Sequence, residues 1–149
     1  MWETIKQICI SFLMVIITVQ LSLRKFRTEK WWEKKAEAYA KIIDAIHHLK
    51  NYCEQKLNAE YEHSELSPER ENELWQQYKT ALRELARAID VGSFIITNEA
   101  VEALETYQNR PELSWNENSL WSVIEHDLKY TKKCLHDFKI IAKNDLRIK

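Results

Sequence analysis

Near the N-terminus the spacing of apolar residues would place them on all sides of a helix. Further along the chain their spacing would place them in a single stripe on each helix. From Ile5 to Leu23 the sequence reads IKQICISFLMVIITVQLSL, and from Ile8 onward only Ser, Thr, Gln and Cys interrupt the apolar residues. Nineteen residues in a helix cover roughly 28 Å, close to the hydrocarbon thickness of a bilayer. The pattern predicts a transmembrane helix, and its membrane contacts are expected from Trp2, Ile8, Phe12, Val15, Ile16 and Leu23.

Basic residues follow this apolar run and set its expected orientation. The basic residues are Arg24, Lys25, Arg27, Lys30, Lys34 and Lys35. They outnumber the acidic residues of the same segment, Glu29 and Glu33. The positive-inside rule then places the C-terminal side in the cytoplasm, where these side chains also meet anionic lipid headgroups. A cleaved signal peptide would carry its basic residues before the apolar core, so we favour a single-pass anchor. A helix buried in a protein core is the remaining alternative.

Single apolar stripes predict four helices after the basic residues. In the first, Trp32, Tyr39, Ile46 and Cys53 recur every seven residues over a helix of about 30 residues. Ser67 and Pro68 mark the start of a second helix, and Gly92 is placed to end it with a left-handed cap.

The third and fourth helices are predicted from their N-terminal signals. Thr97 is the expected N-cap of a short helix that ends before Pro111. Ser114 and Glu117 form a capping box for the fourth helix. Its stripe is Leu120, Ile124, Leu128, Thr131, Leu135, Phe138 and Ala142.

These elements define the expected fold class and domain organisation. The fold class is all-α, an N-terminal transmembrane helix followed by an antiparallel helical bundle of three long helices and one short helix. Residues 1–27 would form the anchor with its basic flank, and residues 28–149 the cytoplasmic bundle. The single Gly and two Pro among 149 residues agree with a helical chain.

Charge and cysteine content exclude several classes of function. The formal net charge of −1 provides no overall field that would attract nucleic acid, so no nucleic-acid partner is expected. The three cysteines form no CxxC pair, which favours a reduced compartment. We expect Cys53 and Cys134, on or near the stripes, to be small core residues.

The histidines are the only candidates for a metal or hydrolytic site. His126 and His136 each precede an aspartate, yet helical geometry turns His126 and Asp137 away from the buried stripe. The adjacent His47 and His48 diverge around their helix rather than chelating together. We therefore expect no catalytic residue, no metal and no cofactor, and we expect that the protein is not an enzyme.

Tryptophans provide the candidate partner surface. Trp31 lies near headgroup level if the first helix continues beyond Leu23, and Trp75 and Trp115 belong to the cytoplasmic part. Tryptophan dominates the hot spots of protein interfaces, although a place in the core is the alternative for each of these residues.

One combination of segments carries a resemblance that covers nearly the whole chain. TEKWWEKKAEAYAKIIDAIHHLK after an apolar N-terminal helix, with DVGSFIITNEAVEAL further on, resembles uncharacterised bacterial single-pass membrane proteins with a cytosolic helical domain. Some of these are associated with mobile or defence-related loci. The resemblance implies a bacterial inner-membrane location and no particular activity or site residue.

Two functions are expected from these features. The first is a membrane-anchored helical interaction protein that tethers a protein partner, or assembles with itself, at the inner membrane. The alternative is a membrane-acting effector or toxin-like component that oligomerises in the bilayer, with Ser11, Thr18 and Gln20 packed between helices.

Overall fold

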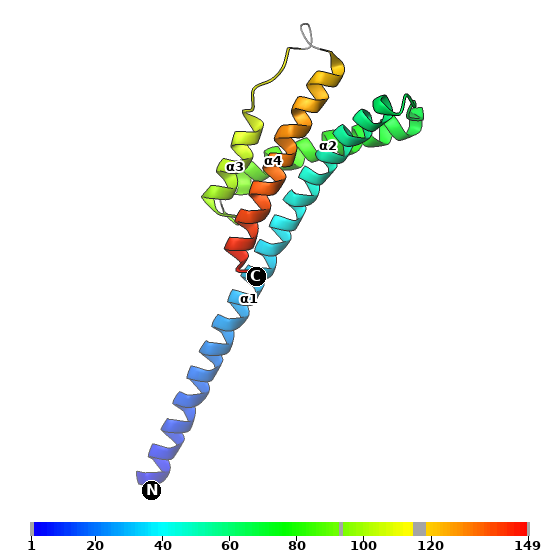
Figure 1. The fold of residues 1–149 in the computed structure, drawn as a ribbon. Coiled ribbons are helices and arrows are strands. Elements are labelled where there is room, and N and C mark those ends of the chain that lie inside the picture. The colour runs from blue at the N-terminus through cyan, green and yellow to red at the C-terminus, as the bar shows by residue number, and fades with distance from the viewer. Residues whose placement is uncertain (1, 93, 115–118, 149) are drawn as a thin grey trace. The chain divides into compact units, whose positions relative to one another are not determined.

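The computed structural model describes the backbone of residues 2–92, 94–114 and 119–148, and the side chains of these residues apart from 2–6 and 8–11. The described residues form four helices and no strand (Figure 1). These helices are α1 (Trp2–Tyr61), α2 (Pro68–Gly92), α3 (Asn98–Gln108) and α4 (Leu120–Leu146). The all-α fold class is therefore confirmed.

The chain divides into two compact units, Met1–Lys35 and Ala36–Lys149, and α1 contributes residues to both. In the first unit every described side chain from Phe12 to Lys34 is exposed. The division comes after Lys35, whereas the boundary between residues 27 and 28 stays a prediction.

The transmembrane helix also stays a prediction. Among the residues whose side chains the structure describes, no helix has a sufficiently long and apolar stretch to cross a membrane. This finding covers only part of the predicted anchor, because Ile5, Lys6 and residues 8–11 lie outside the described side chains. Two of the predicted membrane contacts, Trp2 and Ile8, are among the side chains left out.

The second unit is a bundle in which successive helices run in opposite directions. Residues near the start of one helix contact residues near the end of the next, as the colours in Figure 1 also show for α3 and α4. The rings of Tyr52 in α1 and Tyr78 in α2 are tilted with centroids 4.6 Å apart, and the hydroxyl of Tyr107 in α3 lies 3.0 Å from that of Thr131 in α4. The last helix, α4, returns beside residues 36–61 of α1. The antiparallel arrangement is confirmed.

The predicted stripes form the core of this unit. Tyr39, Ile46, Leu49 and Phe138 are at most 1% exposed, and the rings of Tyr39 and Phe138 lie 5.6 Å apart. A smaller cluster consists of Cys53, Leu57, Ile124 and Leu128. The stripes are wrong at two positions: Trp32 is 48% exposed, and Leu120, the first residue of α4, is 46% exposed.

Two of the predicted helix starts are confirmed by hydrogen bonds. The Ser67 hydroxyl accepts from the Arg70 backbone N–H at 3.3 Å, and Pro68 is the first residue of α2. The Thr97 hydroxyl accepts from the Ala100 N–H at 3.3 Å, and α3 ends at Gln108, before Pro111. Each hydroxyl satisfies a donor that the first helical turn leaves unpaired.

At Gly92 the predicted helix end is confirmed and the predicted cap is wrong. Gly92 does end α2, but no described glycine has a positive φ, so the left-handed cap is absent there. A Cβ at Gly92 would lie 3.0 Å from Cδ1 of Ile96, so the residue is small because the following turn packs closely on it. The fourth helix begins at Leu120 with Ser119 as its N-cap, and the predicted Ser114 capping box depends on a residue that the structure does not describe. Glu117 itself lies outside the described residues.

Candidate functional site

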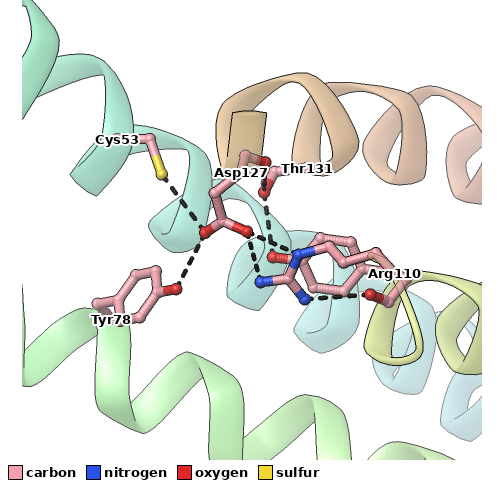
Figure 2. Close-up of polar contacts among 6 residues, drawn as sticks. Cys53, Tyr78, Arg110, Asp127 and Thr131 are labelled. Atoms are coloured by element: carbon pink, nitrogen blue, oxygen red, sulfur yellow. Dashed lines mark hydrogen bonds and ion pairs between the residues drawn. The ribbon is translucent and has the colours of Figure 1, made fainter. Parts of the chain in front are cut away.

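A buried polar cluster joins all four helices of the second unit and has Asp127 at its centre (Figure 2). Cys53 comes from α1, Tyr78 from α2, and Asp127 from α4. Arg110 follows Asn109, the C-cap residue of α3. Residues from four separate segments therefore meet at one carboxylate, and we call this group the Asp127 cluster.

Both carboxylate oxygens of Asp127 accept hydrogen bonds. Nε of Arg110 donates to Oδ1 at 2.7 Å, and Nη2 of Arg110 forms an ion pair with the same oxygen. The Tyr78 hydroxyl donates to Oδ2 at 3.0 Å, and the Cys53 thiol lies 3.8 Å from Oδ2. The Arg110 and Asp127 side chains are 17% and 16% exposed, so the ion pair is largely removed from water.

Tyr107 and Thr131 hold the two charged residues in place. The Thr131 hydroxyl donates to the backbone carbonyl of Asp127 at 2.8 Å, so it accepts from the Tyr107 hydroxyl, 3.0 Å away. Nη1 of Arg110 donates to the Tyr107 carbonyl at 3.1 Å, and the guanidinium carbon lies 4.3 Å from the centre of the Tyr107 ring. The cluster is thus closed on itself by hydrogen bonds and a cation–π contact.

The protonation of the cluster argues against nucleophilic or acid–base chemistry. Burial, and then the negative charge of Asp127, raises the pKa of the Cys53 thiol to about 12. Burial first and Asp127 second also raise the pKa values of the Tyr78 and Tyr107 hydroxyls. A thiol that stays protonated at neutral pH is a poor nucleophile. The arrangement is suited to cross-linking helices.

A second polar contact lies where the chain enters the bundle. The Tyr39 hydroxyl donates to Oδ2 of Asp145 at 2.7 Å and accepts from the Thr97 N–H at 3.4 Å. These three residues come from α1, the end of α4 and the cap of α3. Burial is the main cause of the raised pKa of Tyr39. This contact fixes the end of the bundle opposite the α1–α2 connection.

The adjacent His47 and His48 on α1 have ring centroids 6.2 Å apart. Nε2 of His48 is 3.5 Å from a carboxylate oxygen of Asp44, its neighbour on α1, and the His126 ring contacts Tyr130. In the described part of the chain no group of His, Cys, Asp or Glu side chains could hold a metal ion. Cys53 and Cys134 are free thiols and are 1% and 6% exposed, which confirms both as core residues.

The predicted partner and headgroup residues that the structure describes are exposed, apart from Lys35. Trp31 is 51% exposed and Trp75 is 43% exposed, whereas Trp115 lies outside the described residues. Of the predicted headgroup residues, Arg24, Lys25, Arg27, Lys30 and Lys34 are exposed and Lys35 is half-buried. Lys25 and Lys30 form ion pairs with the glutamates one helical turn further on.

Sequence reasoning missed the Asp127 cluster, although a signal for it was present. Asp127 lies three residues after Ile124 and four before Thr131, so it faces the same side of α4 as two stripe residues. A carboxylate in that position needs a buried partner. The partner, Arg110, lies in the α3–α4 connection, where no periodic pattern indicates which way its side chain points.

No protein-family model, curated protein or solved structure matches this chain.

Proposed function

We propose that this protein is a membrane-anchored helical interaction protein. Its N-terminal apolar helix would span the bacterial inner membrane with the N-terminus outside. Its bundle would hold a protein partner, or a second copy of the chain, at the cytoplasmic face. Binding would use exposed helix faces rather than a catalytic pocket.

The exposed apolar stretch of α1 carries this proposal. Phe12 is 68% exposed, Ile16 is 42% exposed and Leu23 is 49% exposed. Exposure of so many large apolar side chains to water is unfavourable in free energy. A contiguous apolar surface of this kind indicates a contact with a membrane or with another protein. Lipid chains would cover all sides of the helix at once, which agrees with apolar residues that follow no single stripe.

The basic residues after this stretch support its orientation. Arg24, Arg27 and Lys34 form no ion pair with any described residue, so their charges are available to anionic headgroups. Such residues on the C-terminal side of a span favour a cytoplasmic bundle. Trp31 and Trp75, with Trp115 on the evidence of sequence alone, are the proposed partner residues.

The Asp127 cluster supports a scaffold more than an enzyme. It joins four chain segments through satisfied hydrogen bonds, and its thiol and phenols stay protonated at neutral pH. A bundle fixed in this way would present its surface residues to a partner with little rearrangement.

The membrane-acting effector receives less support. The Thr18 hydroxyl donates to the Met14 carbonyl of its own helix at 2.8 Å. In this conformation the hydroxyl does not donate to a neighbouring helix. Only its acceptor capacity remains for a neighbouring helix, and hydrogen bonds between helices are one of the forces that hold such assemblies together.

Purification of the tagged full-length protein in mild detergent, followed by mass spectrometry and molar-mass measurement, tests the proposal. The expected result is a second protein in fixed stoichiometry that is lost on Trp75→Ala. The control is Trp121→Phe, which should retain the partner, because Trp121 of α4 is half-buried against the cluster that contains Cys53 and Ile124. A homo-oligomer lost on Trp75→Ala would indicate self-assembly by the same surface. A monomer without any partner would contradict the proposal.

A further inference from the structure

A shallow depression of about 470 Å³ lies where α1 and α2 meet, and it belongs entirely to the second unit. Tyr52 and Trp75 provide its aromatic wall, and Pro68, Glu71 and Asn72 complete the lining. We call this depression the Trp75 groove. It is separate from the Asp127 cluster, although Tyr78 contacts both.

The aromatic wall is held rigidly. The rings of Trp75 and Tyr78 are stacked at 11° with centroids 5.6 Å apart, and Tyr52 packs 5.8 Å from Trp75. The hydroxyl of Tyr78 is in turn hydrogen-bonded to Asp127. Trp75 nevertheless remains 43% exposed. A fixed, half-exposed tryptophan binds a partner at low conformational cost.

The chain on both sides of Pro68 is acidic. Four glutamates there are exposed and form no ion pair with any described residue, and they are Glu60, Glu62, Glu65 and Glu69. Arg70 is paired with Glu73 at 2.7 Å and Lys56 is paired with Glu71, whereas Lys79 lies over the Trp75 ring and forms no ion pair with any described residue. The segment that leads into the groove therefore carries a net negative charge, which favours a cationic partner at the aromatic surface.

The aromatic wall itself accepts a cation. Nζ of Lys79 lies 5.7 Å from the centre of the Trp75 ring. Trp is the most favourable aromatic residue for cation–π contacts, and an arginine side chain can stack on such a ring while it pairs with carboxylates.

We propose that the Trp75 groove binds an arginine-rich segment of the partner protein. A guanidinium would stack on the exposed face of Trp75, and neighbouring basic residues would pair with the four free glutamates. This inference rests on the proposed function and names the chemistry of the partner that the tether would hold.

A peptide-binding measurement on the full-length protein tests the inference. The protein is placed in nanodiscs of neutral phosphatidylcholine, so that the lipid adds no charge. The probe is a fluorescein-labelled RGRGRGRG peptide, followed by anisotropy, and EGEGEGEG is the acidic control. We expect saturable binding of the basic peptide, weakened at least fivefold by Trp75→Ala and by raising the salt concentration.

A charge-matched pair of variants separates the groove from general electrostatic attraction. Glu60→Gln, Glu62→Gln and Glu65→Gln together should weaken peptide binding at least threefold. Glu99→Gln, Glu102→Gln and Glu105→Gln remove the same charge from exposed positions on α3 and should change it less than twofold. The glutamate variants also cover the case in which Trp75→Ala unfolds the bundle.

The outcomes distinguish this inference from the tether itself. No saturable binding, equal weakening by both triple variants, or comparable binding of EGEGEGEG would overturn the inference. Self-association through the groove, detected by molar mass without peptide binding, would overturn it in favour of a second copy. Failure of the protein to attach to membranes would contradict the tether while leaving peptide binding by the groove unchanged.

Discussion

The two parts of α1 differ in how far their apolar residues are buried. From residue 12 to 34 every side chain is exposed, including the large apolar ones. From residue 36 to 61 the apolar residues fall on one stripe, and Tyr39, Ile46, Leu49 and Cys53 in it are at most 1% exposed. The difference follows from periodicity, because helices on one side can cover a stripe, while an apolar surface on all sides needs cover all around the helix.

The largest contrast is expected from removing one phenylalanine in each unit. Phe138→Ala should lower the free energy of unfolding of the bundle by about 4 kcal/mol, because this ring is fully buried against Tyr39. Phe12→Ala should change it by less than about 0.5 kcal/mol, since Phe12 is 68% exposed. Urea unfolding of the full chain in mild detergent, followed by circular dichroism, measures both values. Equal losses in the free energy of unfolding for the two variants would contradict this difference between the two parts of α1.

The Asp127 cluster should be nearly as sensitive as the apolar core. Asp127→Ala is expected to cost about 3 kcal/mol, because it leaves the largely buried Arg110 guanidinium unpaired. The double variant Arg110→Met with Asp127→Leu should recover most of this loss, since no buried charge remains. The same urea measurements give both numbers. A double variant as unstable as the sum of the single variants would show that the cluster contributes more than a compensated charge.

Alkaline pH should destabilise the bundle through its buried thiols. The pKa values of Cys53 and Cys134 rise from 9.0 to about 12 on folding, chiefly through burial. Their stabilising contribution is complete below pH 9 and is lost as pH rises toward 12. Within that window each thiol should lower the free energy of unfolding by about 1.4 kcal/mol per pH unit.

Cys134→Ala provides the comparison for this pH dependence. It should reduce the slope of the free energy of unfolding between pH 9 and pH 11, and Cys53 with the buried tyrosines would supply the remainder. An unchanged slope would show that Cys134 ionises as easily in the folded chain as in the unfolded one.

The smallest expected effect concerns the N-cap of α4. Ser119→Ala should lower the free energy of unfolding by about 1 kcal/mol, because the Ser122 N–H loses its acceptor. Thr106→Ala is the control: its exposed hydroxyl donates only within its own helix, and the expected change is below about 0.5 kcal/mol. Thermal unfolding resolves such a difference. Equal effects would assign the loss to the hydroxyl group rather than to the cap.

The helices and their core faces could be predicted because they depend on local periodicity. Tyr39, Ile46, Phe138 and Ala142 were identified from spacing alone, and Ser67 and Thr97 from capping chemistry. The end of α2 was predicted at the correct residue for the wrong reason. A Cβ at Gly92 would lie 3.0 Å from Cδ1 of Ile96, a close approach that a cap rule does not contain.

The candidate sites were harder to predict because they depend on contacts between helices. Asp127, Arg110 and Tyr78 come from three elements, and only the fold brings them together. The Trp75 groove likewise needs Tyr52 of α1 beside Pro68 of α2. Trp75 was predicted as a partner residue from its residue type. The acidic residues near it in the sequence point to a cationic partner only once the structure shows the groove.

Fractionation of native membranes measures whether the N-terminal helix attaches the protein to the bilayer. The full-length protein is compared with residues 24–149 after a wash in 1 M NaCl, which screens attraction between basic residues and headgroups. We expect the full-length protein to stay in the membrane pellet until detergent is added, and the shortened chain to be released by salt. Release of the full-length protein by salt alone would contradict this expectation.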